Sequence, residues 1–390
     1  MIRRLTRVAH QIDHAIGRLG SMRRVLVELR TPVSKAILSP IYEPLLDTPD
    51  LEVCFTSEYP ERIVPIVGPK RFLTHRQVEW RRFDLYFNAD PWARARLRRC
   101  AREVNFFHGV AGKYDLDSPK GLPLGYESYD RVAFVNRDRM TRYLDAGVVT
   151  PRQACLVGYP KLDRLASGAI DGAKVRTALG LDASRQTVLY APTYSPASSL
   201  HSAGEAIVRA AADAGWNVIV KVHDRSLDPD PRYSGGIDWR SRMRTLEEPG
   251  RICYVEDADS SPFLAAADAL ITDHSSVGFE YLVLDRPLIV FDVPGLLEAA
   301  RINPEKMAQL HWAAHVVSSV AGLREELRTA ALVPAAKSRE RRRIAAHVFH
   351  EPGTATERAI ALIGEMLGRQ PSHSRVTFGG RQTAGGGLAT

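Results

Sequence analysis

The chain has 390 residues, of which 45% are hydrophobic and 25% are charged, a composition typical of soluble globular proteins. This length favours two domains of ordinary size over a single core. No apolar run approaches the roughly 20 residues that cross a bilayer, and no uninterrupted apolar stretch follows the first arginines, so we expect neither a membrane span nor a secretory signal. These features predict a cytoplasmic protein.

The formal net charge is +8, which favours anionic partners such as phospholipid, nucleic acid or phosphorylated substrates. The first thirty residues hold seven arginines against only Asp13 and Glu28. Apolar residues recur there every three or four positions from Ile2 to Leu19, which predicts a basic amphipathic helix in a segment spanning residues 1–30. Such a helix either lies on the inner face of the plasma membrane, with the protein bound peripherally, or packs its apolar face on the protein.

From residue 51 onward, short β-branched or aromatic runs alternate with helical stretches, as in βαβ units with a mostly parallel sheet. We assign residues 31–170 to an N-terminal Rossmann-like acceptor domain. Asp90-Pro91 predicts the start of a helix that continues through Arg99. The expected strands are residues 51–55, 83–87, 104–107, 131–135 and 154–157.

A linker is expected near residues 167–173, and the same rhythm then restarts in a C-terminal Rossmann-like nucleotide-donor domain, residues 171–352. We expect a helix at residues 353–367 that crosses back toward the first domain, and a disordered tail at 368–390. The fold class is therefore α/β, with two doubly wound domains facing an interdomain cleft. The expected strands of the C-terminal domain are 187–190, 217–222, 251–255, 269–272 and 288–291, and its expected helices are 203–214, 261–267 and 277–284.

The first of several polar strand ends follows residues 104–107, where His108 enters a glycine-flanked turn. Imidazole titrates near neutrality and can accept a proton from a hydroxyl nucleophile, although a histidine that only caps a turn gives the same pattern. Glycine lets the backbone approach a ligand closely. We predict His108 as catalytic and Gly109 and Lys113 as acceptor-binding residues.

A second strand, residues 217–222, delivers Lys221, His223 and Arg225. Strand alternation puts Lys221 and His223 on the same side, where both can face an anionic group or lie as solvated surface charges. A lysine or a histidinium neutralises charge that builds on a phosphoryl oxygen. We predict His223 as catalytic and Lys221 and Arg225 as donor-binding.

A third strand, residues 269–272, leads through Asp273 into Ser275 and Ser276 at the start of a helix. Free backbone N–H groups at such a start favour phosphate, whereas plain capping by serine is the simpler interpretation. Glu280, one turn later, either binds a ribose or glycerol hydroxyl or faces solvent. We predict all four residues as donor-binding.

A fourth strand, residues 187–190, ends in a rigid turn with hydroxyl residues, and Thr193 and Tyr194 are predicted to bind the donor. The sequence shows neither a GxxxxGK[ST] phosphate loop nor a DxD-like acidic pair. Four widely spaced cysteines also lack metal-ligand spacing. We therefore predict no metal and no cofactor.

Together these strand ends resemble the CDP-glycerol glycerophosphotransferase family, the teichoic-acid primases and polymerases with a GT-B-like fold. The resemblance covers roughly residues 108–292. It departs from the family pattern at Asp224, where a proline is usual, and at His274, where a tyrosine is usual. It rests on His108-Gly109, Ala191-Pro192-Thr193-Tyr194, Lys221-Val222-His223, Thr272-Asp273-His274-Ser275-Ser276 and the segment 285–292.

This resemblance implies transfer of glycerol phosphate, or a similar polyol phosphate, from a CDP-linked donor to an acceptor hydroxyl, with release of CMP, in synthesis of a cell-envelope or capsule polymer. It implies that His108 is the general base, that His223 stabilises the transferring phosphate, and that Ser275 and Ser276 bind the diphosphate. The acceptor is either lipid-linked or a saccharide. The alternatives are a GT-B glycosyltransferase or epimerase that uses a UDP- or CMP-sugar, and a non-enzymatic basic protein that binds membrane or nucleic acid.

Overall fold

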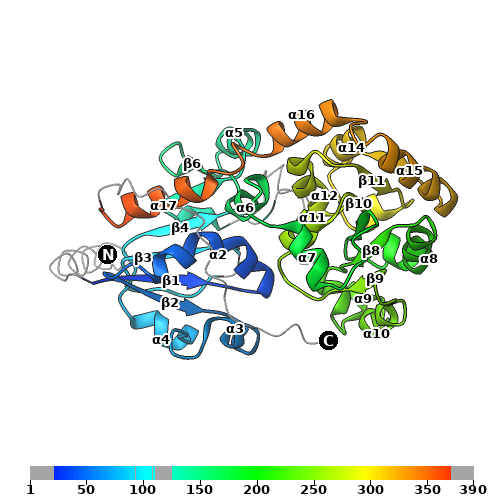
Figure 1. Cartoon of the computed structure of the whole chain (residues 1–390). Coiled ribbons are helices and arrows are strands. Elements are labelled where there is room, and N and C mark those ends of the chain that lie inside the picture. The colour runs from blue at the N-terminus through cyan, green and yellow to red at the C-terminus, as the bar shows by residue number, and fades with distance from the viewer. Residues whose placement is uncertain (1–21, 93, 108, 110–124, 370–390) are drawn as a thin grey trace.

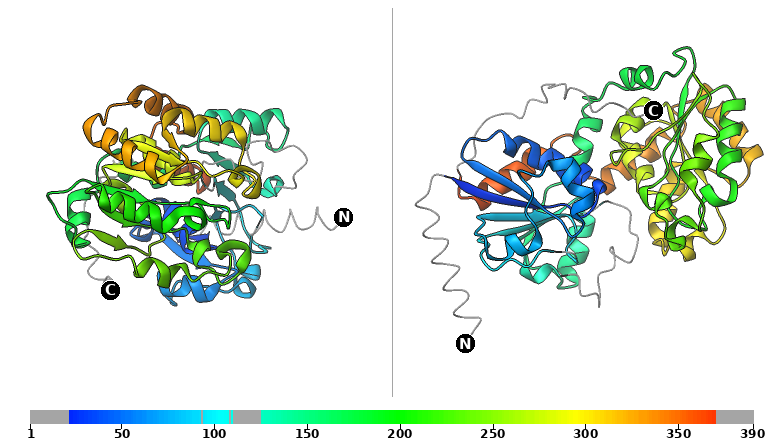
Figure 2. Two further views of the ribbon diagram at one scale, coloured as in Figure 1. Left: turned by 90° about the vertical axis from the view of Figure 1, so that its right-hand side faces the viewer. Right: turned by 90° about the horizontal axis from the view of Figure 1, so that it is seen from below.

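The structure is a computed structural model that describes residues 22–92, 94–107, 109 and 125–369 (Figure 1). Within this part of the chain, two six-stranded sheets form, and every strand pair in them is parallel. The sheets lie in separate lobes (Figures 1 and 2). The predicted α/β class with two Rossmann-like domains is confirmed.

The first sheet has the strand order β2-β1-β3-β4-β5-β6, and its interior strands are nearly continuous apolar runs because helices cover both faces of such sheets. Its strands are β1 (Arg23–Glu28), β2 (Leu51–Thr56), β3 (Leu85–Asn88), β4 (Glu103–Phe106), β5 (Arg131–Phe134) and β6 (Ala154–Leu156). The helices of this lobe are α2 (Pro32–Leu46), α3 (Pro60–Val67), α4 (His75–Trp80), η1 (Tyr126–Ser128), α5 (Arg137–Asp145), η2 (Pro160–Leu162) and α6 (Asp163–Ala166).

The second sheet has the order β12-β11-β10-β7-β8-β9. Its strands are β7 (Thr187–Tyr190), β8 (Asn217–Val220), β9 (Ile252–Tyr254), β10 (Ala269–Thr272), β11 (Leu288–Phe291) and β12 (His315–Val317). Its helices are α7 (Gly172–Ala178), α8 (Ser199–Asp213), η3 (Asp224–Leu227), α9 (Pro231–Ser234), α10 (Trp239–Arg244), α11 (Ser261–Ala266), α12 (Ser276–Tyr281), η4 (Leu282–Leu284), α13 (Leu296–Ala299), α14 (Pro304–Ala313), α15 (Val320–Leu332) and α16 (Ser338–Val348).

The basic N-terminal segment is shorter than predicted, because residues 23–28 form β1 and not helix. This strand pairs with both β2 and β3, and Val25, Leu26 and Val27 have no exposed surface. The run Val-Leu-Val forms the buried part of the strand. The arginines that flank it made the segment resemble a continuation of the basic helix. The predicted helix at Ile2 to Leu19 lies outside the described residues.

The helix predicted from Asp90 to Arg99 is wrong over the part that the structure describes, which has no helical turn there. Tertiary hydrogen bonds hold this segment instead. The Ala95 N–H donates to Glu28 Oε2 at 2.8 Å, and the Arg99 carbonyl accepts from the Phe83 N–H at 3.0 Å. A helix would commit these backbone groups to local partners, so the long-range contacts override the capping signal.

The last helix, α17 (Ala355–Met366), packs against α2 and η2 of the first lobe, and Figure 1 shows it lying along that lobe. Buried Asp163 anchors its start by accepting from the Gly353 N–H at 2.8 Å and from the Thr356 N–H at 2.5 Å. Arg131 then pairs with Glu365 at 3.0 Å. No helix among the described residues is long and apolar enough to cross a membrane.

Candidate functional site

The predicted donor residues converge at the carboxyl edge of the second sheet. Strand β7 pairs with both β10 and β8, so the loops that leave these three strands emerge side by side. Parallel α/β sheets place ligands beyond this edge. The sequence signals at Thr193, Lys221 and Ser275 therefore belong to one region of the fold.

An aromatic and cationic cluster, in which the rings are half-buried and the arginine is exposed, forms the outer part of this region. The rings of Tyr194 and His223 lie 4.7 Å apart between centroids. The Arg225 guanidinium covers Tyr194 at 4.9 Å and Tyr233 at 5.1 Å, and its Nη1 donates to the Tyr194 hydroxyl at 3.1 Å. Cation–π contacts and this hydrogen bond fix the arginine, so a positive charge is held beside the histidine.

The His223 ring has a defined hydrogen-bonding direction. This residue caps η3, and its Nδ1 accepts the Arg225 backbone N–H at 3.1 Å. An Nδ1 that accepts a hydrogen bond carries no proton, so the neutral ring is the Nε2–H tautomer. His223 can therefore donate a hydrogen bond from Nε2 without first becoming a cation, which differs from the histidinium considered from the sequence.

Two buried lysines add positive charge behind this cluster. Burial lowers the pKa of Lys221, the Asp224 carboxylate opposes that shift, and the charge of Lys161 adds to it. Lys161 donates from Nζ to Glu280 Oε2 at 2.7 Å and to the Ser260 hydroxyl at 3.2 Å. Burial by itself would lower the pKa of Lys161, but Glu280 raises it above the usual value. The ion pair with Glu280 therefore keeps Lys161 charged, whereas burial disfavours the charged form of Lys221.

Glu280 is not solvent-facing, which excludes one of its two predicted roles. Its side chain is 3% exposed and pairs with Lys161, which lies on η2 beyond β6 of the first sheet. Glu280 lies on α12, which follows β10 of the second sheet. This ion pair therefore joins the carboxyl ends of the two sheets at one point.

The Asp273 carboxylate holds neighbouring backbone segments in place. The residue is fully buried, and its carboxylate accepts from the Thr193 N–H at 2.7 Å and from the Ser199 N–H and hydroxyl at 3.0 Å each. These bonds tie the loop after β7 and the start of α8 to the end of β10. Because both carboxylate oxygens accept hydrogen bonds from the protein, Asp273 is better suited to positioning the Thr193 and Tyr194 loop than to direct donor contact, the role predicted from the sequence.

Ser275 and Ser276 lie at the start of α12, as the sequence indicated. Ser275 occupies the N-cap position, but its side chain makes no capping hydrogen bond, so the simpler capping interpretation is wrong. Ser275 is buried and Ser276 is half-buried. Both hydroxyls lie at the edge where the helix presents its first N–H groups.

His108 and Lys113 lie outside the described residues, but the structure fixes both neighbours of His108. Phe107 is buried between Phe134, at 4.8 Å, and Tyr143, at 5.3 Å between ring centroids. Arg139, almost fully buried, donates from Nη1 to the Gly109 carbonyl at 2.9 Å and lies 5.2 Å above the Phe107 ring. Gly109 itself has φ +70°, a conformation that favours glycine.

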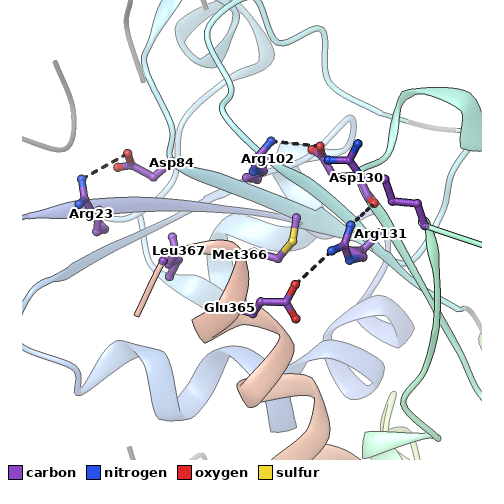
Figure 3. Close-up of a pocket in the computed structure, with 10 residues that line it drawn as sticks. Arg23, Asp84, Arg102, Asp130, Arg131, Glu365, Met366 and Leu367 are labelled. Carbon is purple, nitrogen blue, oxygen red and sulfur yellow. Dashed lines mark hydrogen bonds and ion pairs between the residues drawn. The ribbon is translucent and has the colours of Figure 1, made fainter. Parts of the chain in front are cut away.

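A separate pocket lies at the opposite, amino edge of the first sheet (Figure 3). Its charged residues pair with one another, as in Arg102–Asp130 at 3.4 Å and Arg131–Glu365 at 3.0 Å. None of the predicted site residues lines it. Because parallel sheets bind ligands at the carboxyl edge, we assign no role in donor binding to this pocket.

The sequence did not predict the contributions of Lys161, Tyr233 and Arg139. Lys161 pairs with Glu280, Tyr233 contacts Arg225, and Arg139 donates to the Gly109 carbonyl in the first lobe. Lys161 follows the Gly158-Tyr159-Pro160 turn after β6, and a lysine directly after a strand and turn was a usable signal. Arg139 and Tyr233 lie within short helices, where charged and aromatic residues are common. Only their tertiary contacts distinguish them.

Two parallel-sheet domains with polar residues gathered at the carboxyl edge define an α/β protein of the GT-B-like class. The sequence model of the family described as CDP-Glycerol:Poly(glycerophosphate) glycerophosphotransferase matches residues 117–360. The chain belongs to this family, which confirms the resemblance seen in the sequence and supports the predicted transferase class.

Individual relatives agree with this assignment. A teichoic acid glycerol-phosphate transferase from Staphylococcus aureus (strain NCTC 8325 / PS 47) is 30% identical over 140 residues, which are 34% of this chain and 34% of that protein. The match thus spans about a third of the curated relative.

Solved structures share the fold. The wall teichoic acid polymerase TagF superposes with a TM-score of 0.64 and 17% identity, over 94% of this chain and 96% of that chain. The UDP-GlcNAc 2-epimerase from Neisseria meningitidis superposes with a TM-score of 0.53 and 13% identity, over 88% of this chain and 100% of that chain. At these identities the structural similarity establishes the fold alone. The family match is what favours a glycerophosphotransferase over a UDP-GlcNAc 2-epimerase.

Proposed function

We propose that the chain transfers glycerol phosphate from CDP-glycerol to an acceptor hydroxyl and releases CMP. The observation that carries this proposal is the placement of His223, Lys221 and Arg225 at the carboxyl edge of the second sheet in a member of this family. A variant of TagF has been solved after soaking with CDPG, which supports the same donor class. Synthesis of a cell-envelope polymer such as teichoic acid is the process that these relatives indicate.

The reaction needs one new P–O bond and one broken P–O bond. The acceptor oxygen attacks the phosphorus that carries glycerol, its proton passes to a base, and CMP leaves with the electron pair of the broken bond. We assign the base role to His108, as the family resemblance implies. Gly109 and Lys113 are proposed to contact the acceptor.

Hydrogen-bond donors and cations stabilise the negative charge on the transferring phosphate. His223 donates from Nε2, which its Nδ1 hydrogen bond keeps in the required tautomer. Lys221 and Arg225 supply positive charge, and Ser275 and Ser276 supply hydroxyl and N–H donors. Thr193 and Tyr194 complete the donor site, positioned by Asp273.

The test is release of CMP from CDP-glycerol by the purified full chain with a glycerol-phosphate-primed acceptor. His223→Ala should reduce turnover about a hundredfold or more, since lost general acid–base or charge-stabilising groups typically cost that much. His347→Ala, at an exposed position on α16, is the matched control and should retain parental turnover. Parental turnover in His223→Ala would remove this residue from the mechanism.

The same assay separates the epimerase alternative. A UDP-sugar epimerase would change the sugar configuration without an acceptor, whereas the proposed enzyme should leave UDP-GlcNAc unchanged. Donor binding also stabilises a fold by mass action. CDP-glycerol should therefore raise the melting temperature more than UDP-GlcNAc at equal concentration, and the reverse order would contradict the proposal.

We further propose that the basic N-terminal segment attaches the protein peripherally to an anionic membrane surface that presents the acceptor. Each basic residue near such a surface contributes about 1 kcal/mol, and salt weakens the attraction. Because β1 begins at Arg23, the test deletes residues 2–21 only. The shortened chain should lose sedimentation with phosphatidylglycerol vesicles but still use a soluble acceptor, and continued sedimentation would exclude this segment as the anchor.

A further inference from the structure

A compact group of metal-ligand side chains, none of them assigned a role above, lies at the carboxyl edge of the second sheet. His274 lies two residues beyond the end of β10, Asp292 follows β11 directly, and His311 lies on α14. Strands β10 and β11 are adjacent and parallel, so their ends bring His274 and Asp292 to the same edge. One nitrogen or oxygen atom from each of the three residues lies within 4.8 Å of the other two.

We propose that His274, Asp292 and His311 bind a divalent transition-metal ion, with Zn²⁺ as the representative ion. Two imidazoles and a carboxylate form a donor set that suits Zn²⁺, Fe²⁺ or Ni²⁺, whereas Mg²⁺ and Ca²⁺ prefer oxygen ligands alone. No local pattern in the sequence indicated this site, because the two histidines lie 37 positions apart.

The separation between the two imidazoles already matches chelation. Nε2 of His274 lies 3.2 Å from Nε2 of His311. Two nitrogens that each bind tetrahedral zinc at about 2.0–2.1 Å lie about 3.3–3.4 Å apart. A metal ion can therefore replace the shared proton between the rings without moving either backbone.

The carboxylate needs only a small side-chain movement. Asp292 Oδ1 lies 4.0 Å from His311 Nε2, and its side chain is 35% exposed, so rotation can close the remaining distance. The Asp292 N–H donates to the Val317 carbonyl at 2.7 Å, which fixes its backbone. Two strand ends and a ten-residue helix thus hold the three ligands. Three protein ligands leave a fourth tetrahedral position for water or an anionic oxygen.

The test uses the untagged full chain after treatment with EDTA and dialysis. Zn²⁺ is titrated in competition with a chromophoric chelator. The parent protein should bind one equivalent, and excess Mg²⁺ should not displace it. His311→Gln and His274→Asn should each weaken binding at least about a hundredfold and Asp292→Asn at least about tenfold, because even indirect partners of a metal contribute about 10–100-fold.

The matched control is His315→Gln, four residues after His311. His315 is half-buried and its Nδ1 pairs with Glu326 at 2.8 Å, so this variant should bind Zn²⁺ like the parent. Co²⁺ offers a second readout, since a tetrahedral site gives visible absorption bands that His311→Gln should lack. Melting temperatures in EDTA confirm folding, and His311 on α14 carries the test if His274→Asn does not fold. Parental zinc affinity in His311→Gln, or absence of a bound equivalent in the parent, would overturn the proposal.

Discussion

Replacement of Lys161 by methionine should destabilise the protein strongly, because it leaves a carboxylate buried between the two lobes. Glu280 is almost fully buried, and its remaining partner in that variant is the Ser260 hydroxyl, which donates to it at 3.4 Å. Removing one partner of a buried ion pair typically costs about 3–5 kcal/mol, whereas replacing both partners by apolar residues of similar volume is often close to neutral. We expect Lys161→Met to fall in that range.

The double variant Lys161→Met/Glu280→Met tests this reasoning. It should recover most of the loss and give a coupling energy of about 2–3 kcal/mol in a double-mutant cycle. The assay is urea unfolding followed by circular dichroism at pH 7.5, with each transition fitted separately because two lobes can unfold in two steps. A loss below about 1 kcal/mol for Lys161→Met, or strictly additive effects in the double variant, would refute the buried-pair argument.

Three further perturbations follow from particular contacts. Arg139→Met should lower the free energy of unfolding by about 1–3 kcal/mol, since the Gly109 carbonyl loses its donor. The variant should also reduce CDP-glycerol turnover at least tenfold. Unchanged turnover would show that this arginine does not position the His108 turn. Asp273→Asn should cost about 2–4 kcal/mol in urea unfolding through its bonds to Thr193 and Ser199, and a fully stable variant that binds CDP-glycerol weakly would instead favour direct donor contact. The hydrogen bond between His75 and Glu28 raises the pKa of His75 and should stabilise the fold by less than about 1 kcal/mol at this partly exposed site. This stabilisation is complete below about pH 6.5 and is lost as pH rises through the raised pKa of the folded state. His75→Gln should remove this pH-dependent loss of stability, and identical profiles of unfolding free energy against pH for both proteins would contradict the prediction.

The sequence by itself located ten of the strands, because buried parallel strands are short apolar runs that need no long-range information to recognise. Since ligands bind beyond the carboxyl ends of such strands, the same pattern identified the ends that carry Lys221, His223 and Ser275. It missed β1, where arginines flank the apolar run, and the three-residue strand β12. It also failed at Asp90, where a local capping signal competed with hydrogen bonds to Glu28.

The tertiary structure decided how these strand ends are combined. Strand order is set by crossovers, so the sequence could not show that the ends of β10 and β11 bring His274 beside Asp292, or that α14 adds His311. The Lys161–Glu280 pair joins residues 119 positions apart, and the role of Glu280 changes with that contact. A buried charge must find a partner wherever the fold provides one, and no local pattern in the chain encodes which partner that is.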